Sequence, residues 1–253
     1  MKIHHQPFFR KRSAGFTLVE LLVTVTIILV LAMVAFFGAR KLRSGADTVT
    51  TIKRISGLAQ ANALYAADHG GKYVPIYTFD EDRLPGIPWH YNPVFLEALI
   101  GESLSIEEAE EYEGVDGLPE QVLDPVVVRA KQRYWSRISA SFAYASENMP
   151  GGGWGQPGTS RAHTVTSVKY PSETFAFITA TDWIANYGGR FLWRNSPVEG
   201  KSNDSKIAYR HGGKAVVAFY DGHASTMTIY EMRDIDRKGG INHVFWGGEL
   251  RSR

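Results

Sequence analysis

The feature that most constrains the fold is a long apolar run near the N-terminus. Residues 16–38 contain a single charged side chain, Glu20. As a helix rising about 1.5 Å per residue, this run measures about 34 Å, which is long enough to cross the hydrocarbon of a bilayer. A carboxylate placed in lipid is costly unless it is paired, so Glu20 is a candidate functional residue.

Basic residues flank the run on both sides, with Lys2, Arg10, Lys11 and Arg12 before it and Arg40, Lys41 and Arg43 after it. Their distribution leans slightly toward a cytoplasmic N-terminus. A cleaved secretory signal is the main alternative, but its apolar core is shorter and is followed by a small-x-small site. The segment 36–40 offers no such site, and we therefore expect the helix to be retained.

The sequence Gly15-Phe-Thr-Leu-Val-Glu20 resembles the processing site of type IV prepilins and type II secretion pseudopilins. The resemblance implies that prepilin peptidase removes a basic leader, residues 1–15, on the cytoplasmic side and methylates the new N-terminal residue, Phe16. It also implies that Glu20 pairs with the N-terminal amine when subunits join a filament at an inner-membrane assembly platform. The alternative is a plain signal anchor with an incidental glutamate.

The physical chemistry of the pair agrees with this resemblance. Cleavage would give Phe16 a cationic amine, and methylation leaves that amine protonatable. A cation and the carboxylate of Glu20 attract strongly where the dielectric constant is low. Residues four apart share a helix face, so the pair can close within one subunit or between neighbours.

The amino-acid composition excludes several classes of function. The 253 residues carry a net charge of +2, which gives no case for nucleic acid, and 13 Phe, 12 Tyr and 6 Trp indicate a folded body. Cysteine is absent, which excludes disulfides and cysteine-based metal sites. We expect no cofactor and no enzymatic activity, since no nucleophile elbow, zinc-binding His-Glu-x-x-His or phosphate loop occurs.

The apolar helix is predicted to continue through residues 39–69. An apolar stripe with three- and four-residue steps, formed by Val49, Ile52, Ile55, Ala59 and Ala63, would face a globular body. Gly70 and Gly71 then cap the helix. The turn that follows is similar to one in pilin-like proteins. The expected fold is α+β and type IV pilin-like, a long helix packed on the antiparallel sheet of an extracytoplasmic domain, residues 70–253.

Within that domain the patterns predict several short elements. Helices are expected at 95–100 and from Ser105, where Ser105 and Glu108 have capping-box spacing. Residues 151–158 are expected to form a loop. Strands are expected at 139–148, 165–168 and 174–178.

The clearest local signal in the domain is a hairpin around Asp221-Gly222, a two-residue turn signature. Counting from that turn predicts three facing pairs: Tyr220 with His223, Phe219 with Ala224, and Val217 with Thr226. His211, nine residues and then Asp221-Gly222 resemble the C-terminal H-x9-DG element of some bacterial pilin-like proteins.

A metal site at His211, Asp221 and His223 is an alternative that strand geometry disfavours. Ten strand steps separate His211 from Asp221 by roughly 33 Å unless the chain folds back at Gly212-Gly213. Asp221 is therefore interpreted as a turn former and His211 as a capping or packing residue, with no metal bound.

The sequence therefore predicts a structural subunit, a pilin or pseudopilin, whose partners are like subunits, prepilin peptidase, the assembly platform and membrane lipid. A second reading is a minor tip pilin that binds polysaccharide or secreted cargo through Trp154, Trp183 and Trp193. For Trp183 and Trp193, packing in the core or between subunits is the competing interpretation.

Overall fold

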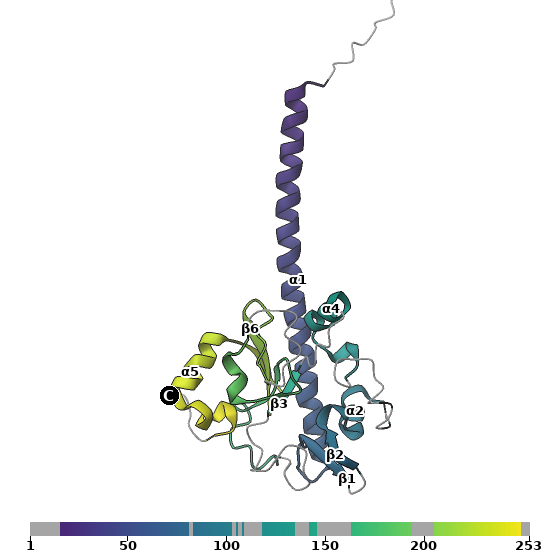
Figure 1. Cartoon of the computed structure of the whole chain (residues 1–253), viewed down its shortest axis with the longest axis vertical. Coiled ribbons are helices and arrows are strands. Elements are labelled where there is room, and N and C mark those ends of the chain that lie inside the picture. The colour runs from purple at the N-terminus through teal and green to yellow at the C-terminus, as the bar shows by residue number, and fades with distance from the viewer. Residues whose placement is uncertain are drawn as a thin grey trace, which may run out of the picture. The chain divides into compact units, whose positions relative to one another are not determined.

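A single helix, α1, dominates the N-terminal part of the chain (Figure 1). The computed structural model describes residues 16–80, 83–102, 105, 108, 118–134, 142–145, 163–193 and 205–248. Helix α1 spans Leu18–Asp68, 51 residues, which confirms the predicted helix. The chain divides into two compact units, Met1–Arg43 and Ser44–Arg253, and α1 contributes residues to both.

The end of α1 follows the predicted glycine cap. Gly70 and Gly71 have φ values of 62° and 79°, a left-handed conformation that glycine adopts without a steric penalty. The Gly71 amide donates to the Ala66 carbonyl at 2.8 Å, which satisfies one of the last unpaired helix carbonyls.

The second unit is built on a five-stranded sheet with the order β5-β3-β4-β6-β7. The strands are β3 Phe142–Ala145, β4 Phe175–Thr179, β5 Ile184–Ala185, β6 Lys214–Phe219 and β7 Ala224–Thr228. The β3–β5 pair is parallel and every other pair in this sheet is antiparallel. A mixed α+β fold with a long N-terminal helix, as in type IV pilins, is thus confirmed.

Shorter elements surround the sheet. The helices are α2 Pro93–Ile100, α4 Pro125–Tyr134 and α5 Ile229–Gly239. Short 3-10 helices lie at Trp89–Tyr91, Glu120–Val122, Tyr187–Phe191, Gly240–Asn242 and Val244–Trp246. A separate antiparallel hairpin joins β1 Tyr77–Asp80 to β2 Arg83–Pro88. The prolines of β2 hid this hairpin from sequence reasoning, since proline is tolerated only at sheet edges.

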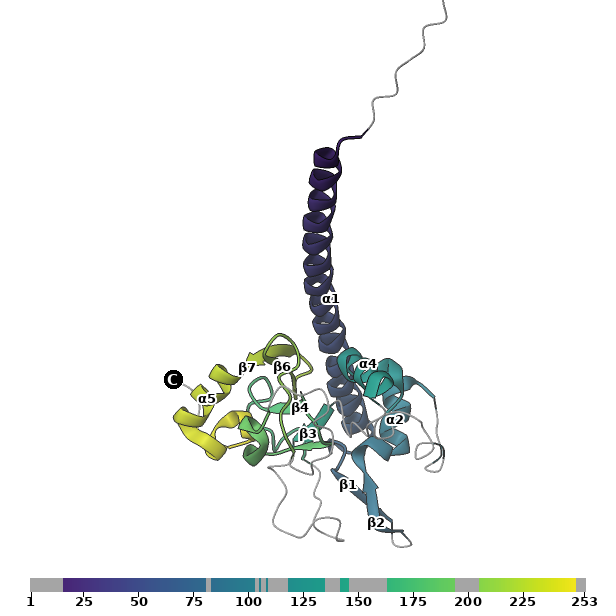
Figure 2. The same ribbon diagram turned by 45° about the horizontal axis from the view of Figure 1, so that its top comes forward.

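The sheet lies between the lower part of α1 and α5 (Figure 2). An aromatic-rich core lies on each of its faces, one including residues of α1 and the other including Met232 of α5. Strand β6 alternates between them. Val216 and Ala218 belong to the core that includes Ile55 and Leu58 of α1. Ala215, Val217 and Phe219 belong to the core that includes Met232, Phe245 and Trp246.

The predicted strand at 165–168 is wrong. These residues form a turn, and only Thr164 makes an isolated bridge, to Lys72. Ser167 accepts from the Thr164 amide at 2.9 Å and donates its own amide to the Thr164 hydroxyl at 3.1 Å. Hydroxyl side chains that bond the nearby backbone in this way compete with strand pairing.

The predicted stripe on α1 is wrong at two positions. Val49 is 67% exposed, and Ala63 is also exposed. The buried face instead comprises Thr51, Ile55, Leu58, Ala59, Ala61, Asn62, Tyr65 and Ala66. Sequence reasoning discounted its polar members, but both have buried partners: Thr51 contacts Asp124, and the Asn62 side chain accepts from the Val74 amide.

Three further predictions lie wholly or partly outside the described residues. The Ser105 and Glu108 capping bonds are present, at 2.8 and 3.1 Å, but most of the helix that they would begin is outside. The strand at 139–148 is observed as β3, and the rest of that range is outside. The loop at 151–158 lies entirely outside.

Candidate functional site

The first turn of α1 is closed by a reciprocal pair, Thr17 and Glu20. Oε2 of Glu20 accepts from the Thr17 amide at 2.9 Å and from the Thr17 hydroxyl at 2.8 Å. The Glu20 amide donates to the Thr17 hydroxyl at 3.2 Å. This is a capping box, in which Thr17 is the N-cap and Glu20 is the third helical residue. The arrangement holds the Glu20 carboxylate at the positive end of the helix dipole.

Phe16, the residue expected to become the N-terminus, lies directly before this cap and is 76% exposed. Its backbone nitrogen is the one that precedes the Thr17 amide, which already binds Oε2 of Glu20. Among the described residues, Oε1 of Glu20 makes no hydrogen bond. Gly15 lies outside the described residues.

The surface of α1 after this cap is apolar all round. Side chains from Leu18 to Phe37 are exposed, and the exposed fractions of the large apolar ones run from 47% at Val25 to 82% at Leu18. Within the part of the chain that the structure describes, α1 is the one helix long and apolar enough to cross a membrane, judged by length and composition. An apolar surface on every side is typical of a helix surrounded by lipid or by other helices.

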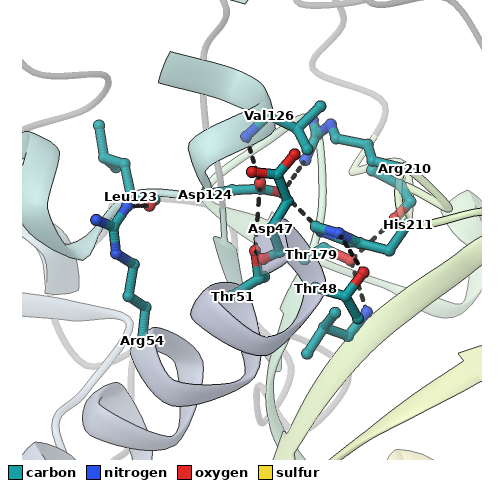
Figure 3. Close-up of polar contacts among 12 residues, drawn as sticks. Asp47, Thr48, Thr51, Arg54, Leu123, Asp124, Val126, Thr179, Arg210 and His211 are labelled. Carbon is teal, nitrogen blue, oxygen red and sulfur yellow. Dashed lines mark hydrogen bonds and ion pairs between the residues drawn. The ribbon is translucent and has the colours of Figure 1, made fainter. Parts of the chain in front are cut away.

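His211, the first residue of the H-x9-DG element, lies in a buried polar cluster shown in Figure 3. Its Nε2 lies 3.1 Å from Oδ2 of Asp124, and the two side chains are 1% and 0% exposed. Its Nδ1 lies 3.4 Å from the hydroxyl of Thr48 on α1. His211 therefore joins the sheet, the loop before α4 and the long helix at one point.

Asp124 is the acceptor at the centre of this cluster. Its Oδ1 also accepts from the Val126 amide at 2.8 Å and from the Thr51 hydroxyl at 3.4 Å, and Arg210 lies 3.9 Å from Oδ2. Burial alone raises the pKa of this carboxyl group. The hydrogen bond from His211, the charges of Arg210 and His211 and the Val126 amide together outweigh burial and hold the pKa of Asp124 below its ordinary value.

Two further contacts join α1 to the segment that includes Leu123 and helix α4. Arg129 of α4 forms a bidentate ion pair with Asp47. Arg54 donates to the Leu123 carbonyl, one residue before Asp124 (Figure 3). Arg–carboxylate pairs with two parallel bonds fix orientation as well as supplying energy. Three successive turns of α1, at Asp47, Thr51 and Arg54, thus contact residues between Leu123 and Arg129.

The other end of the element, Asp221-Gly222, forms the turn between β6 and β7 as predicted, but the predicted register is wrong. Ala218 faces Ala224, and Val217 faces Ser225. The Phe219 amide donates to the His223 carbonyl at 2.9 Å, so three residues rather than two form the loop. Gly222 has φ of 90°, and a left-handed glycine is the residue that closes such a three-residue loop.

Asp221 and His223 stabilise this loop rather than reaching the His211 cluster. Oδ1 of Asp221 accepts from the His223 amide at 3.1 Å and lies 2.5 Å from Nδ1 of the same residue. The imidazole of His223 also stacks on Phe219, with ring centroids 4.3 Å apart. The described residues contain no group of three or more His, Asp or Glu side chains placed to hold a metal ion.

Two of the three tryptophans considered for ligand binding are engaged in packing. Trp183 packs against the core on the α1 side, where its carbonyl accepts from the Trp89 indole at 2.8 Å. Trp193 packs against the opposite core, and the Arg210 guanidinium lies 5.5 Å from its ring centroid. Trp154 lies outside the described residues.

Sequence reasoning missed Thr17, Thr48 and Asp124. Thr17 was detectable, because Thr17-Leu-Val-Glu20 has the same capping-box spacing that was recognised at Ser105. Asp124 was not detectable, since it meets His211 across 87 positions of sequence with no shared motif.

Comparison with known proteins gives one family match. Residues 10–36 match the model described as a prokaryotic N-terminal methylation motif. The match covers the basic residues before the cut, the Gly15–Phe16 bond, the capping box and most of the apolar run. No curated protein and no solved structure matches this chain. The motif and the apolar helix that it overlaps support a type IV pilin-like, membrane-anchored protein that prepilin peptidase processes.

Proposed function

We propose that this chain is a structural subunit of a type IV pilus or a type II secretion pseudopilus. Prepilin peptidase would cleave it after Gly15 and methylate Phe16. The mature helix would then leave the cytoplasmic membrane and pack against like subunits, with residues 44–253 on the outer side of that membrane. The observation that carries the proposal is the methylation motif at residues 10–36, which is continuous with an exposed apolar helix.

The capping box gives the proposed assembly pair a physical basis. After cleavage the Phe16 amine would be next to a carboxylate that the Thr17 bonds already orient. That carboxylate can bind its own amine, or it can turn toward the amine of a neighbour. In a bundle of otherwise uniform apolar helices, such a charge pair is the feature able to fix axial register, because packing of similar apolar side chains tolerates sliding.

Mass analysis of the native protein tests the processing step. The expected mass is that of residues 16–253 plus one methyl group. A chain that retains Met1, or one trimmed beyond Arg40, would contradict the proposal. Replacing Gly15 by a bulky residue is expected to leave the precursor uncut, and a mature protein still beginning at Phe16 would contradict that expectation.

Glu20→Gln tests the assembly pair, since it keeps the size and a hydrogen-bonding oxygen but removes the charge. The variant is expected to insert in the membrane and be cleaved normally while filament yield falls at least tenfold. Thr24→Val is the matched control, because the Thr24 hydroxyl bonds only the Leu21 carbonyl of its own helix among the described residues. Equal filament yields from the two variants would refute the charge-pair mechanism.

A further inference from the structure

The H-x9-DG element touches α1 at both of its ends. His211 contacts Thr48, with Nδ1 and the hydroxyl 3.4 Å apart. At the other end, the Gly222 carbonyl accepts from the Ser56 hydroxyl at 2.7 Å. Thr48 and Ser56 are separated by about 12 Å along the helix axis, at about 1.5 Å per residue. The two contacts are independent in sequence but lie on the same helix.

We propose that the H-x9-DG element is a clasp that grips the C-terminal half of α1 at Thr48 and Ser56. Each residue of the motif has a part in it. His211 supplies the first contact. Asp221 accepts from the His223 amide and so shapes the loop that presents the Gly222 carbonyl. Gly222 itself has φ of 90°, and a Cβ there would meet the Gln60 side chain at 3.9 Å.

The two ends are held at a fixed separation by the strand between them. His211 and Lys214 exchange backbone hydrogen bonds at 3.1 and 3.2 Å, which closes the turn at the first end. Strand β6 then runs between β4 and β7 and is paired on both sides. A central strand of this kind is stiff, so a force applied to α1 passes to the sheet at both contacts.

His211 makes the first contact through its two ring nitrogens, which face different elements. Nε2 lies 3.1 Å from Oδ2 of Asp124, and Nδ1 lies 3.4 Å from the Thr48 hydroxyl. The Thr48 hydroxyl also donates to the Ser44 carbonyl at 2.9 Å, a bond within its own helix. His211 therefore couples α1 to the buried carboxylate of Asp124.

Hydrogen exchange of the full chain in detergent micelles tests the clasp without requiring a filament, so the result stands whether or not the proposed function is correct. Thr48→Val and Ser56→Ala are each expected to speed exchange of the amides of residues 50–62 about fivefold, and the double variant about 25-fold. Thr50→Val is the matched control, because its hydroxyl bonds only the Ala46 carbonyl among the described residues. Rates equal to this control would overturn the clasp.

His211→Gln examines the first contact separately. Glutamine keeps a donor for Asp124 but lacks the second ring nitrogen that faces the Thr48 hydroxyl. We expect His211→Gln to speed amide exchange in residues 50–62 as much as Thr48→Val does, and the two changes combined to give no further increase. Fully additive increases in the exchange rate would overturn the contact.

Discussion

The two halves of α1 share one backbone helix but present different surfaces. Up to Arg43, every large apolar side chain is exposed and the polar contacts are local, within the helix. From Ser44 onward, one face is buried, and its polar groups reach partners far away in sequence. The first half thus presents an apolar surface to its surroundings, as the proposed transfer from membrane to filament would require, whereas the second half is fixed to the sheet domain.

The largest difference is expected between the two carboxylates associated with the helix. Asp124→Ala removes the carboxylate that faces the buried side chains of His211 and Arg210, and it should lower the free energy of unfolding by about 3–5 kcal/mol. Glu20→Ala, at an exposed site, should leave the same transition unchanged. Urea titration followed by tryptophan fluorescence measures both. A loss below about 1 kcal/mol for Asp124→Ala would show that the buried cluster contributes little to stability.

Removal of leucine side chains should distinguish the two halves nearly as strongly. Leu58 is fully buried, and Leu58→Ala should cost about 3 kcal/mol through lost burial and the cavity that remains. Leu29 is 55% exposed, and Leu29→Ala should leave the unfolding of residues 44–253 unchanged. Equal losses in the free energy of unfolding in the two variants would mean that the two halves of α1 unfold together in the detergent used.

Lowering the pH should reduce the free energy of unfolding of residues 44–253, because Asp124 becomes protonated. Because the folded-state pKa is lowered, the stabilisation is complete above the ordinary carboxyl pKa of about 4 and is lost as pH falls through the lowered folded value. Protonation keeps the side chain in place, so the loss is smaller than in Asp124→Ala. Unfolding curves between pH 6 and 2 measure it. Asp124→Asn should show a flatter dependence, and identical slopes would contradict the assignment.

The smallest effect is expected at the start of the first half. Thr17→Val removes the N-cap, and exchange of the first-turn amides in micelles should accelerate about fivefold with no change beyond Leu22. Thr24→Val keeps the cap and serves as the reference. Unchanged exchange in Thr17→Val would show that Glu20 is not held by the capping box.

Sequence reasoning succeeded where signals are local. The length of α1, the Gly70-Gly71 cap and the loop at Asp221-Gly222 each follow from neighbouring residues. It failed to identify Thr51 and Asn62 as members of the buried face of α1. These polar side chains are buried because their hydrogen-bond partners lie in other segments of the chain. The prediction of the hairpin register was wrong because Asp-Gly is compatible with two loops. One is a two-residue turn, and the other is a three-residue loop that ends in a left-handed glycine.

Successive side chains of β6 alternate between the two cores. Changes in the length of the segment 212–220, between His211 and Asp221, should therefore have different effects for odd and even numbers of residues. An insertion of one residue between His211 and the start of β6 would turn Phe219 toward α1 and Ala218 toward α5, so both cores would receive side chains of the wrong size. An insertion of two would keep every side chain on its own face and only displace the loop. Length variants of this segment should therefore be tolerated in even steps and rejected in odd ones.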